Sequence, residues 1–372
     1  MNKRSIILLT HEYPPKRGGA GTYCEELVHA CGELAIPIEA WVPEYAKAYN
    51  LKNSNVITLP IKGTQDWRCS FKSIRQIAKR LNGQDEQFIL HLAEPGSLRA
   101  YLRFGWMVRQ NPKLIITVHG TELIRFCRNP LEKFLFSRLL QKAQKVHVLS
   151  AFNKNALLEL FPKLGEKIFL FPGAPARRLI GRKNTSPSPD EKIKVLCVGR
   201  IHPRKGQDRL LEAISSLPKE LSKKVECIFV GPIVNEKFSD KLRKMAGHAH
   251  CPVSFLGDLG DNDLRIVYES SDLFVMPSME RARSVEGFGF VYLEANSHGI
   301  PVIAHRTGGV EDAVVDRETG FLINPEEPES LRECLIRLIE DDALRKAMGE
   351  KGIKWASSHS WDEVAAQLYS KV

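Results

Sequence analysis

Two glutamates eight positions apart delimit the segment of the chain that is most informative about chemistry, Glu286 to Glu294 (EGFGFVYLE). If most of the segment is helical, this separation corresponds to ~12 Å of axial rise, so the two carboxylates cannot share one proton or one reacting atom. The spacing excludes the close carboxyl pair of a retaining glycoside hydrolase, which is ~5 Å apart. It suits hydroxyls on two rings of one extended ligand, such as the ribose and the hexose of a nucleotide sugar.

The environment of Glu294 argues against the alternative that both glutamates are solvent-facing helix residues. Its neighbours Tyr292, Leu293 and Ala295 form an apolar helix middle. Phe288, Gly289 and Phe290 are expected to open that helix, whose first backbone N–H groups have no partner within the helix and therefore point toward a ligand.

A basic loop, Gly199–Gly206 (GRIHPRKG), follows the first apolar run of the second half and precedes a helical stretch. Arg200 comes directly after the run and Lys205 follows five positions later. Arginine forks two phosphate oxygens, lysine acts as a point charge, and a helix amino terminus favours an anion. The pair suits a diphosphate, and a merely basic surface loop is the alternative.

Two loops of the first half carry further candidates. Gly18 and Gly19 belong to a glycine cluster, which allows close backbone approach to a phosphate and positive φ angles. The cluster matches neither G-x-G-x-x-G nor G-x-x-x-x-G-K-[ST], so it predicts neither a dinucleotide site nor a Walker site. His119 ends an apolar run beside Gly120, a position from which it enters a cleft. A satisfied structural histidine is the alternative there.

The elements that must position these loops are short apolar runs that alternate with helical stretches. The expected strands are 6–9, 36–42, 88–92, 114–118 and 145–149, then 194–198, 225–230, 253–256, 273–276, 301–304 and 320–323. The expected helices are 23–34, 73–81 and 131–142, then 208–216, 239–246, 261–269, 291–298, 311–315 and 330–339. Such alternation predicts parallel sheets covered on both faces, which bind ligands at the carboxyl ends of their strands.

The length of 372 residues, with 43% hydrophobic and 26% charged residues, fits two ordinary globular domains. Proline, glycine and serine interrupt the alternation at 174–192, which is expected to be a linker between domains at 1–173 and 193–356. The eight cysteines are scattered without a C-x-x-C pair, as in reduced cytoplasmic proteins. No apolar run approaches the ~18–20 residues needed to cross a bilayer.

Positive charge is concentrated in the first half, where residues 1–175 contain 25 Lys and Arg against 14 Asp and Glu. Such a field suits nucleic acid, an anionic membrane or a phosphorylated acceptor, and a solvated basic surface is the alternative. Basic and apolar residues interleave from Arg125 to Lys145, as in a helix that lies on an anionic membrane. A core helix with a basic outer face fits that stretch equally well.

Taken together, these segments resemble glycosyltransferase family 4. The resemblance covers nearly the whole chain and rests on the order and spacing of the EYPP…GG opening, HGTE, GR…KG, MPS, the E-x7-E segment and TGG. It implies the GT-B fold, in which two Rossmann-like parallel-sheet domains face a cleft and a C-terminal helix, here 357–372, crosses back onto the first domain. It further implies a retaining hexosyltransferase that uses a UDP- or GDP-linked donor. The acceptor would be a saccharide or a lipid-linked hydroxyl in cell-envelope polysaccharide or glycolipid synthesis.

The resemblance also implies residue roles on the donor side. Arg200 and Lys205 would hold the diphosphate, Glu286 would bind the hydroxyls of the transferred sugar, and Glu294 would bind the ribose. The amides of Phe288, Gly289 and Phe290 would assist Glu286. No metal and no cofactor is expected, because arginine and lysine supply the positive charge.

In the first domain, the resemblance places Gly18 and Gly19 near the phosphates and His119 beside the anomeric carbon and the acceptor hydroxyl. A cytoplasmic protein is expected, with peripheral association of the basic first domain with the inner face of the plasma membrane.

Two other functions remain open at this point. A non-hydrolysing sugar-nucleotide epimerase shares the fold and the donor, but it lacks the combination of E-x7-E with GR…KG. The net charge of +10 also suits a nucleic-acid-binding protein without catalysis. Aromatic RNA-binding strand motifs and zinc fingers are missing from the sequence, so no nucleic-acid partner is expected.

Overall fold

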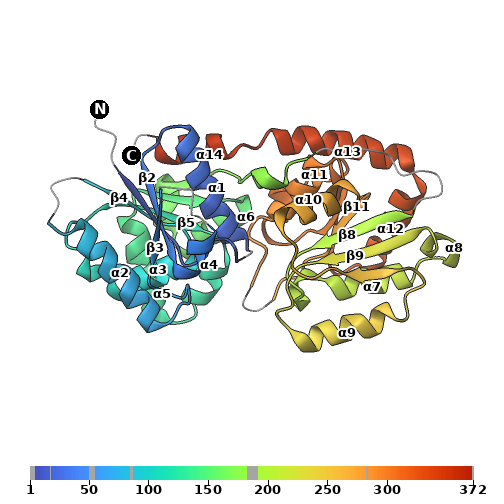
Figure 1. Ribbon diagram of the computed structural model, residues 1–372, viewed down its shortest axis with the longest axis horizontal. Coiled ribbons are helices and arrows are strands. Elements are labelled where there is room, and N and C mark those ends of the chain that lie inside the picture. The colour runs from blue at the N-terminus through green and yellow to red at the C-terminus, as the bar shows by residue number, and fades with distance from the viewer. Residues whose placement is uncertain are drawn as a thin grey trace. The chain divides into compact units, whose positions relative to one another are not determined.

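The computed structural model describes residues 5–16, 18–49, 55–83, 87–181, 192–281 and 284–370. The chain divides into two compact units. Unit 1 contains Met1–Gly173 and Ser360–Val372, and unit 2 contains Ala174–His359. Each unit is a parallel sheet with helices on both of its faces, as Figure 1 shows.

Unit 1 is built on a parallel sheet whose seven described strands have the order β3-β2-β1-β4-β5-β6-β7. The strands are β1 Ile6–Leu9, β2 Ile38–Pro43, β3 Val56–Leu59, β4 Ile89–Leu92, β5 Lys113–Val118, β6 Lys145–Val148 and β7 Ile168–Leu170. In the central register Ile6 pairs with Ile38 on one side and with Ile89 on the other. All residues of β1 and β4 are buried, which is why β1 is a continuous apolar run and β4 is apolar except for His91.

Helices cover both faces of this sheet. They are α1 Gly19–Glu33, α2 Trp67–Leu81, α3 Pro95–Phe104, α4 Thr121–Phe126, α5 Pro130–Lys142, α6 Ala151–Leu160 and α14 Trp361–Tyr369, with short 3-10 turns η1 Glu44–Ala48, η2 Gly105–Met107 and η3 Pro162–Lys167. Helix α3 contacts both α2 and α5, and these three lie together below the sheet in Figure 1. Helix α1 packs against α14.

The C-terminal helix belongs to unit 1, as predicted. In α14, the hydroxyl of Tyr369 lies 2.8 Å from Nδ1 of the buried His91 on β4. The ammonium of Lys145 on β6 donates to the carbonyl of Leu368 at 2.6 Å and so caps the helix. The boundary is later than expected, because Ser357 ends α13 in unit 2 and α14 begins at Trp361.

Unit 2 repeats the architecture with six described parallel strands in the order β10-β9-β8-β11-β12-β13. The strands are β8 Ile193–Val198, β9 Val225–Val230, β10 Val253–Phe255, β11 Leu273–Met276, β12 Val302–His305 and β13 Gly320–Ile323. The helices and 3-10 turns are η4 Arg177–Leu179, η5 Pro203–Lys205, α7 Gln207–Ser215, α8 Lys219–Ser222, α9 Glu236–Ala246, α10 Asp261–Glu269, α11 Phe290–Ser297, η6 Gly308–Asp312, α12 Pro328–Glu340 and α13 Asp342–Ser357.

The start of the expected linker is part of unit 2. Ala174, Ala176 and Leu179 are buried, and η4 contacts α10. Residues 182–191, the most proline- and serine-rich part of the expected linker, lie outside the described residues. The helix expected at 311–315 is instead the 3-10 turn η6.

In each sheet, successive strands are first added on one side of the first strand and later on its other side. The switch lies between β1 and β4 in unit 1 and between β8 and β11 in unit 2. Loops that leave two such strands diverge, and the crevice between them is where doubly wound sheets bind ligands. In unit 2 the two loops are 199–206 and 277–289, which carry the basic loop and Glu286. The topology therefore brings together two segments that are about 80 residues apart in the chain.

Candidate active site

Glu286 lies at the centre of a cluster of cations in unit 2. Its Oε2 atom accepts from Nη1 of Arg204 at 2.6 Å and from Nζ of Lys205 at 2.9 Å. The hydroxyl of Ser278 donates to the same oxygen at 3.2 Å. Burial raises the pKa of Glu286, but attraction to Lys205 and Arg204 outweighs burial and lowers the pKa to about 2. Glu286 is therefore a carboxylate at neutral pH, and it is already oriented.

The backbone of the basic loop explains why Arg204 and Lys205 turn inward. They belong to the 3-10 turn η5, which ends at Gly206 with a φ of 71°. A Cβ atom on Gly206 would lie 1.9 Å from the carbonyl oxygen of Pro277, so the loop presses directly on the end of β11. The amide of Met279 donates to the carbonyl of Arg204 at 2.7 Å and joins the two loops.

Arg200 lies on the same loop, but its side chain is exposed and makes no ion pair with a described residue. The backbone carbonyl of Arg200 accepts from Nε2 of Gln207 at 3.0 Å, which fixes the loop backbone at this residue. The cation that joins Lys205 at Glu286 is Arg204, and the arginine expected from the sequence was Arg200. The available signal was the adjacent pair Arg204-Lys205 before Gly206, but spacing alone does not tell which arginine turns inward.

Helix α11 begins at Phe290, so only the second half of the E-x7-E segment is helical. Gly289 caps the helix with a φ of 100°, and a Cβ atom there would lie 2.5 Å from the ring of Tyr292. The axial separation estimated for a helical segment is therefore wrong. Phe288 and Phe290 are both buried and meet edge to face, with ring centroids 5.4 Å apart.

Glu294 lies on α11 and is only 5% exposed. Its Oε2 accepts from the hydroxyl of Tyr268 at 3.1 Å. The Tyr268 ring stacks on His298 with the centroids 5.3 Å apart and is thereby held in place. These contacts contradict the alternative of a solvent-facing glutamate, and Glu286 and Glu294 have separate partners.

His119 follows β5 in unit 1 and is half-buried. Burial lowers its pKa to about 4, despite its hydrogen bond to Ala93. The ring is therefore neutral at pH 7, and Nε2 donates to the carbonyl of Ala93 at 2.9 Å. Since Nε2 carries the proton, Nδ1 has a free electron pair and acts as an acceptor. The Tyr23 ring packs edge-on against His119, 5.3 Å between centroids.

The backbone of His119 is held by Glu122, whose Oε1 accepts from the His119 amide. Glu122 is fully buried. Its second oxygen, Oε2, has no hydrogen-bond partner among the described residues. Burial raises the pKa of Glu122 to about 7. This carboxyl was not singled out from the sequence, although it ends the HGTE segment.

Gly18 and Gly19 stand at the start of α1, where Gly18 is the N-cap and Gly19 the first helical residue. The φ of Gly18 is 176°, an extended value that any residue adopts, so the expectation of a positive φ is wrong here. A Cβ atom on Gly18 would lie 3.3 Å from Oε2 of Glu12. The missing Cβ atom at Gly18 leaves room for the Glu12 carboxylate beside the amino terminus of α1.

The basic stretch from 125 to 145, expected to be one helix, contains the end of α4, all of α5 and the first residue of β6. Phe136, Leu139 and Leu140 of α5 are buried in the core of unit 1. Leu131, Phe134 and Leu135 are 66%, 56% and 41% exposed. The helix therefore packs on the core and also presents apolar side chains to solvent. No helix in the described parts of the chain is long and apolar enough to cross a membrane.

Two family models match the chain in succession. Residues 17–173 match "Glycosyltransferase Family 4" and residues 182–355 match "Glycosyl transferases group 1". Among curated relatives, the GDP-mannose-dependent alpha-(1-6)-phosphatidylinositol monomannoside mannosyltransferase of Mycobacterium tuberculosis is 26% identical over 98% of this chain and 96% of its own length. The D-inositol 3-phosphate glycosyltransferase of Corynebacterium glutamicum is 34% identical, but over 47% of this chain and 42% of its own length.

Solved structures share the fold at low sequence identity. Anabaena HepE in complex with UDP and glucose has a TM-score of 0.76 at 19% identity, over 98% of both chains. A glycosyltransferase from Rickettsia africae has a TM-score of 0.77 at 19% identity, over 100% of both chains.

Proposed function

The chain belongs to glycosyltransferase family 4 and is a hexosyltransferase, and we propose that it transfers the hexosyl unit with retention of anomeric configuration to a lipid-linked acceptor at a membrane surface. The observation that carries the proposal is the Glu286 carboxylate, held by Arg204 and Lys205 where the unit 2 sheet switches direction. The fixed carboxylate suits sugar hydroxyls, and the cations beside it suit a diphosphate, so the two parts of a donor would bind next to one another.

The donor is a nucleoside-diphosphate hexose bound on unit 2. Arg200, whose side chain is exposed, and Lys205 hold the diphosphate, while Arg204 keeps Glu286 in place. Glu286 accepts hydrogen bonds from hydroxyls of the hexose, and the amides of residues 288–290 assist it. Glu294 accepts from the ribose, with Tyr268 supporting the carboxylate from behind.

Transfer breaks the bond between the anomeric carbon and the diphosphate oxygen and forms a bond from the acceptor oxygen on the same face. The proton of the acceptor hydroxyl passes to the departing phosphate oxygen. Negative charge develops on the diphosphate, so cations that are placed beforehand lower the barrier. A front-side displacement needs no nucleophile from the protein. It fits this site because neither carboxylate is assigned as a nucleophile: two cations bind Glu286, and the hydroxyl of Tyr268 donates to Glu294.

On the acceptor side, His119 lies beside the anomeric carbon and the acceptor hydroxyl, where its neutral Nδ1 accepts from a sugar hydroxyl other than the attacking one, and Gly18 and Gly19 approach the phosphates. A lipid-linked acceptor is supported by the exposed apolar residues of α5 among basic ones. It is also supported by the phosphatidylinositol monomannoside named as the acceptor of the mycobacterial relative. The proposal places the enzyme in the cytoplasm, peripheral to the inner face of the membrane, in cell-envelope glycolipid or polysaccharide synthesis, with no metal or cofactor required.

Thermal stabilisation by a panel of UDP- and GDP-linked hexoses tests the donor site, since a ligand that binds the folded state raises its melting temperature. We expect one base and one hexose to stabilise the protein, and we expect donor turnover to require an added acceptor. Turnover of the nucleotide sugar without any acceptor would support the epimerase instead. Failure of every nucleotide sugar to stabilise the chain would overturn the donor site.

A further inference from the structure

A group of fully buried polar side chains lies in the core of unit 1, beneath the loop that carries His119. Its members are Tyr23 on α1, His91 on β4, Thr117 on β5 and His147 on β6. Thr117 and His147 are register partners, and His91 is the partner of the residue two positions before Thr117. Because residues two positions apart share a face of a strand, the three strand residues point to the same face of the sheet.

Hydrogen bonds join this group to α14 and to the segment after β7, and we call the joined residues the Tyr23 network. The hydroxyl of Tyr369 lies 2.8 Å from Nδ1 of His91, whose Nε2 lies 2.8 Å from Oγ1 of Thr117. The hydroxyl of Tyr23 lies 2.9 Å both from Oγ1 of Thr117 and from Nδ1 of His147. The other ring nitrogen of His147, Nε2, lies 2.9 Å from the carbonyl oxygen of Phe171.

The carbonyl of Phe171 sets the direction of every hydrogen bond in the network. A carbonyl oxygen only accepts, so Nε2 of His147 carries a proton. Burial lowers the pKa of His147 to about 4, so the ring is neutral at pH 7 and its Nδ1 accepts from Tyr23. With its own proton directed to His147, the Tyr23 oxygen accepts from the hydroxyl of Thr117.

The same reasoning extends to α14. The proton of Thr117 is directed to Tyr23, so the Thr117 oxygen accepts from Nε2 of His91. Burial lowers the pKa of His91 well below its usual value, so this ring is also neutral and its Nδ1 accepts from the hydroxyl of Tyr369. All the hydrogen bonds of the network therefore run in one direction, an arrangement in which each bond polarises and strengthens the next.

The ring of Tyr23 is held between His119 and α14. It packs edge-on against the His119 ring, with 5.3 Å between centroids and an angle of 86° between the ring planes. The ring of Trp361, which is buried on α14, lies 5.8 Å from that of Tyr23. The hydrogen bond from Nε2 of His119 to the carbonyl of Ala93 leaves the imidazole free to tilt about that bond. Contact with a fixed Tyr23 ring restricts this tilt.

We propose that Tyr23 is a positioning residue for the transfer reaction, holding the His119 imidazole in the orientation in which Nδ1 faces a sugar hydroxyl, while the Tyr23 network holds Tyr23 itself. Tyr23 is fully buried, so it acts through His119 and not by contact with a substrate. The proposal rests on the proposed function, because it takes His119 as a residue of the acceptor side.

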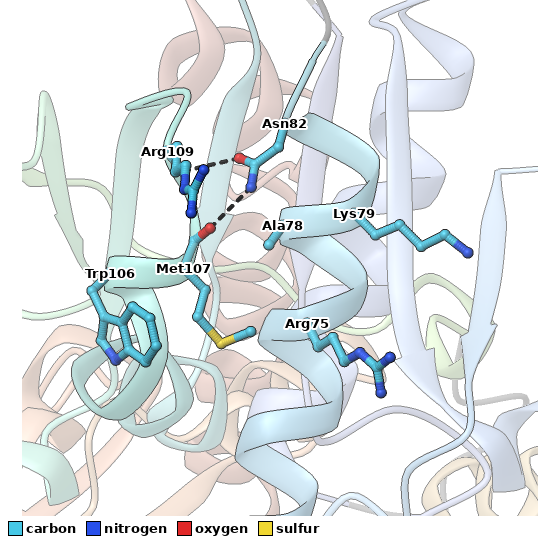
Figure 2. A pocket seen from close by; sticks show the side chains of 7 residues that line it. All are labelled: Arg75, Ala78, Lys79, Asn82, Trp106, Met107 and Arg109. Atoms are coloured by element: carbon cyan, nitrogen blue, oxygen red, sulfur yellow. Dashed lines mark hydrogen bonds between the residues drawn. The ribbon is translucent and has the colours of Figure 1, made fainter.

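A second hydrogen-bonded junction of unit 1 provides a control for purely structural damage. The side-chain amide of Asn82 donates to the carbonyl of Met107 at 3.0 Å, and its side-chain oxygen accepts from the backbone amide of Arg109 at 2.9 Å. Figure 2 shows both bonds beside a surface pocket of about 490 Å³. This junction lies where the chain enters β5, whereas His119 follows the carboxyl end of that strand. N82A therefore removes two hydrogen bonds far along the strand from His119.

Steady-state kinetics of the full chain with its donor and acceptor test the proposal. A misplacement of 1 Å can cost ~100-fold in rate, so Y23F, which keeps the ring and loses its hydrogen bonds, is expected to lower kcat roughly 10-fold. Y23L also loses the ring and is expected to lower kcat roughly 100-fold. The KM for the donor is expected to change less than about twofold, because the donor binds on unit 2.

Two variants are expected to keep kcat within about twofold of the wild type. One is N82A. The other is Y369F, which removes a tyrosine hydroxyl from the far end of the Tyr23 network and leaves the bonds of Tyr23 in place, since Phe171 still sets their direction. If Y23F had the same kcat as these two variants, Tyr23 would not position His119 and the proposal would be overturned.

A double-mutant cycle shows whether the effect passes through His119. In an H119N background, Y23F is expected to lower kcat by less than about twofold further, because residues that act as a unit are not additive. An equal loss in the wild-type and H119N backgrounds would mean that Tyr23 supports the fold in general. That result would also overturn the proposal.

Side-chain nitrogen NMR of histidine-labelled protein tests the network without turnover. At pH 7, His91, His119 and His147 are each expected to carry their proton on Nε2, with signals assigned by single substitutions. Y23L is expected to change the His119 signals, and N82A is expected to leave them unchanged. A proton on Nδ1 of His91 or His147, or His119 signals that Y23L does not change, would overturn the proposal. If the NMR results are as expected but the wild type transfers no hexosyl unit, the proposed function fails and the positioning of His119 by Tyr23 stands.

Discussion

The guanidinium of Arg204 lies 2.6 Å from Oε2 of Glu286, closer than the ammonium of Lys205 at 2.9 Å. Three charged groups, two positive and one negative, are therefore in contact at the end of β11. The pair of cations holds the carboxylate ionised and in one place. Together the two cations carry one more positive charge than Glu286 neutralises, and this charge remains available to a diphosphate.

Replacement of Arg204 by glutamine is expected to reduce kcat/KM roughly 10- to 100-fold, the effect of losing one hydrogen bond between charged groups. The pKa of Glu286 is depressed to about 2, so loss of one cation raises it and moves the acidic limb of activity to higher pH. Steady-state kinetics across pH measure both effects.

R209Q serves as the control for R204Q. Arg209 is an exposed arginine of α7 whose ion pair joins Glu212 at 3.1 Å, so its loss is expected to leave the pH profile unchanged. If R204Q had wild-type kinetics at every pH, Arg204 would have no role in holding the Glu286 carboxylate for catalysis.

Glu294→Ala is expected to weaken nucleotide binding by roughly 10- to 100-fold, since the ribose loses a charged acceptor. Glu286→Ala is expected to slow transfer with a smaller effect on binding of the free nucleoside diphosphate. Calorimetric titration with the nucleoside diphosphate separates the two variants. E220A on α8, where the glutamate side chain is 82% exposed, is the matched control. Equal nucleotide affinity of E294A and wild type would show that Glu294 is not the ribose ligand.

Glu122 and His119 give stability opposite dependences on pH. The pKa of Glu122 is raised to about 7 from 4.5, so the folded state binds more protons and stability falls as pH rises from about 5 to 7. The pKa of His119 is lowered to about 4 from 6.5, so stability rises as pH rises from 4 to 6.5. Melting temperatures across this range should show a smaller fall in E122Q and a smaller rise in H119N. Part of each remains, because the pKa of Glu94 is also raised and the pKa values of His147 and His305 are also lowered to about 4.

These two variants control for one another, because Glu122 lies in the first turn of α4 and accepts from the amide of His119 just before that helix. A fall in stability toward pH 7 that persists unchanged in E122Q would assign the titration to another group. His119 stays neutral above about pH 5, so its titration is expected to cause no rise or fall of activity near pH 7.

Gly206→Ala is expected to destabilise the protein by at least ~2 kcal/mol, since it combines a strained positive φ with a backbone clash. The new Cβ atom would meet the carbonyl oxygen of Pro277 at 1.9 Å. Thermal unfolding should show a drop of several degrees. Gly32→Ala is the control: Gly32 lies in α1, a Cβ atom there meets nothing within 4 Å, and alanine favours the helix. If G206A melted like the wild type, the tight junction between the two loops would be refuted.

The central strands could be predicted from the sequence because burial on both faces makes them continuous apolar runs. β1, β9 and α10 have the predicted bounds. The edge strand β7 was missed, since its three residues are only partly buried or exposed. Helix α3 was missed because it opens with Pro95-Gly96, which reads as a turn. In the structure Glu94 caps it by accepting from the amides of Gly96 and Ser97.

The candidate site was predictable as a set of loops, but its contacts were not. Parallel strands alone place the basic loop near Glu286, since both loops leave strands at the same edge. Whether Arg200 or Arg204 meets the carboxylate depends on the 3-10 turn η5 and the left-handed Gly206, which residue spacing does not encode. The beginning of α11 was similarly decided by the positive φ of Gly289.

The anomeric configuration of the transfer product tests whether the Glu286 site transfers a hexosyl unit with retention. The protein is incubated with an α-linked nucleoside-diphosphate hexose that stabilises it and with a lipid-linked acceptor, and the anomeric proton of the product is observed by NMR. With retention at this site, we expect an α-linked product that forms only when acceptor is present and that nearly disappears with Glu286→Ala. A β-linked product, or an unchanged rate with Glu286→Ala, would contradict it.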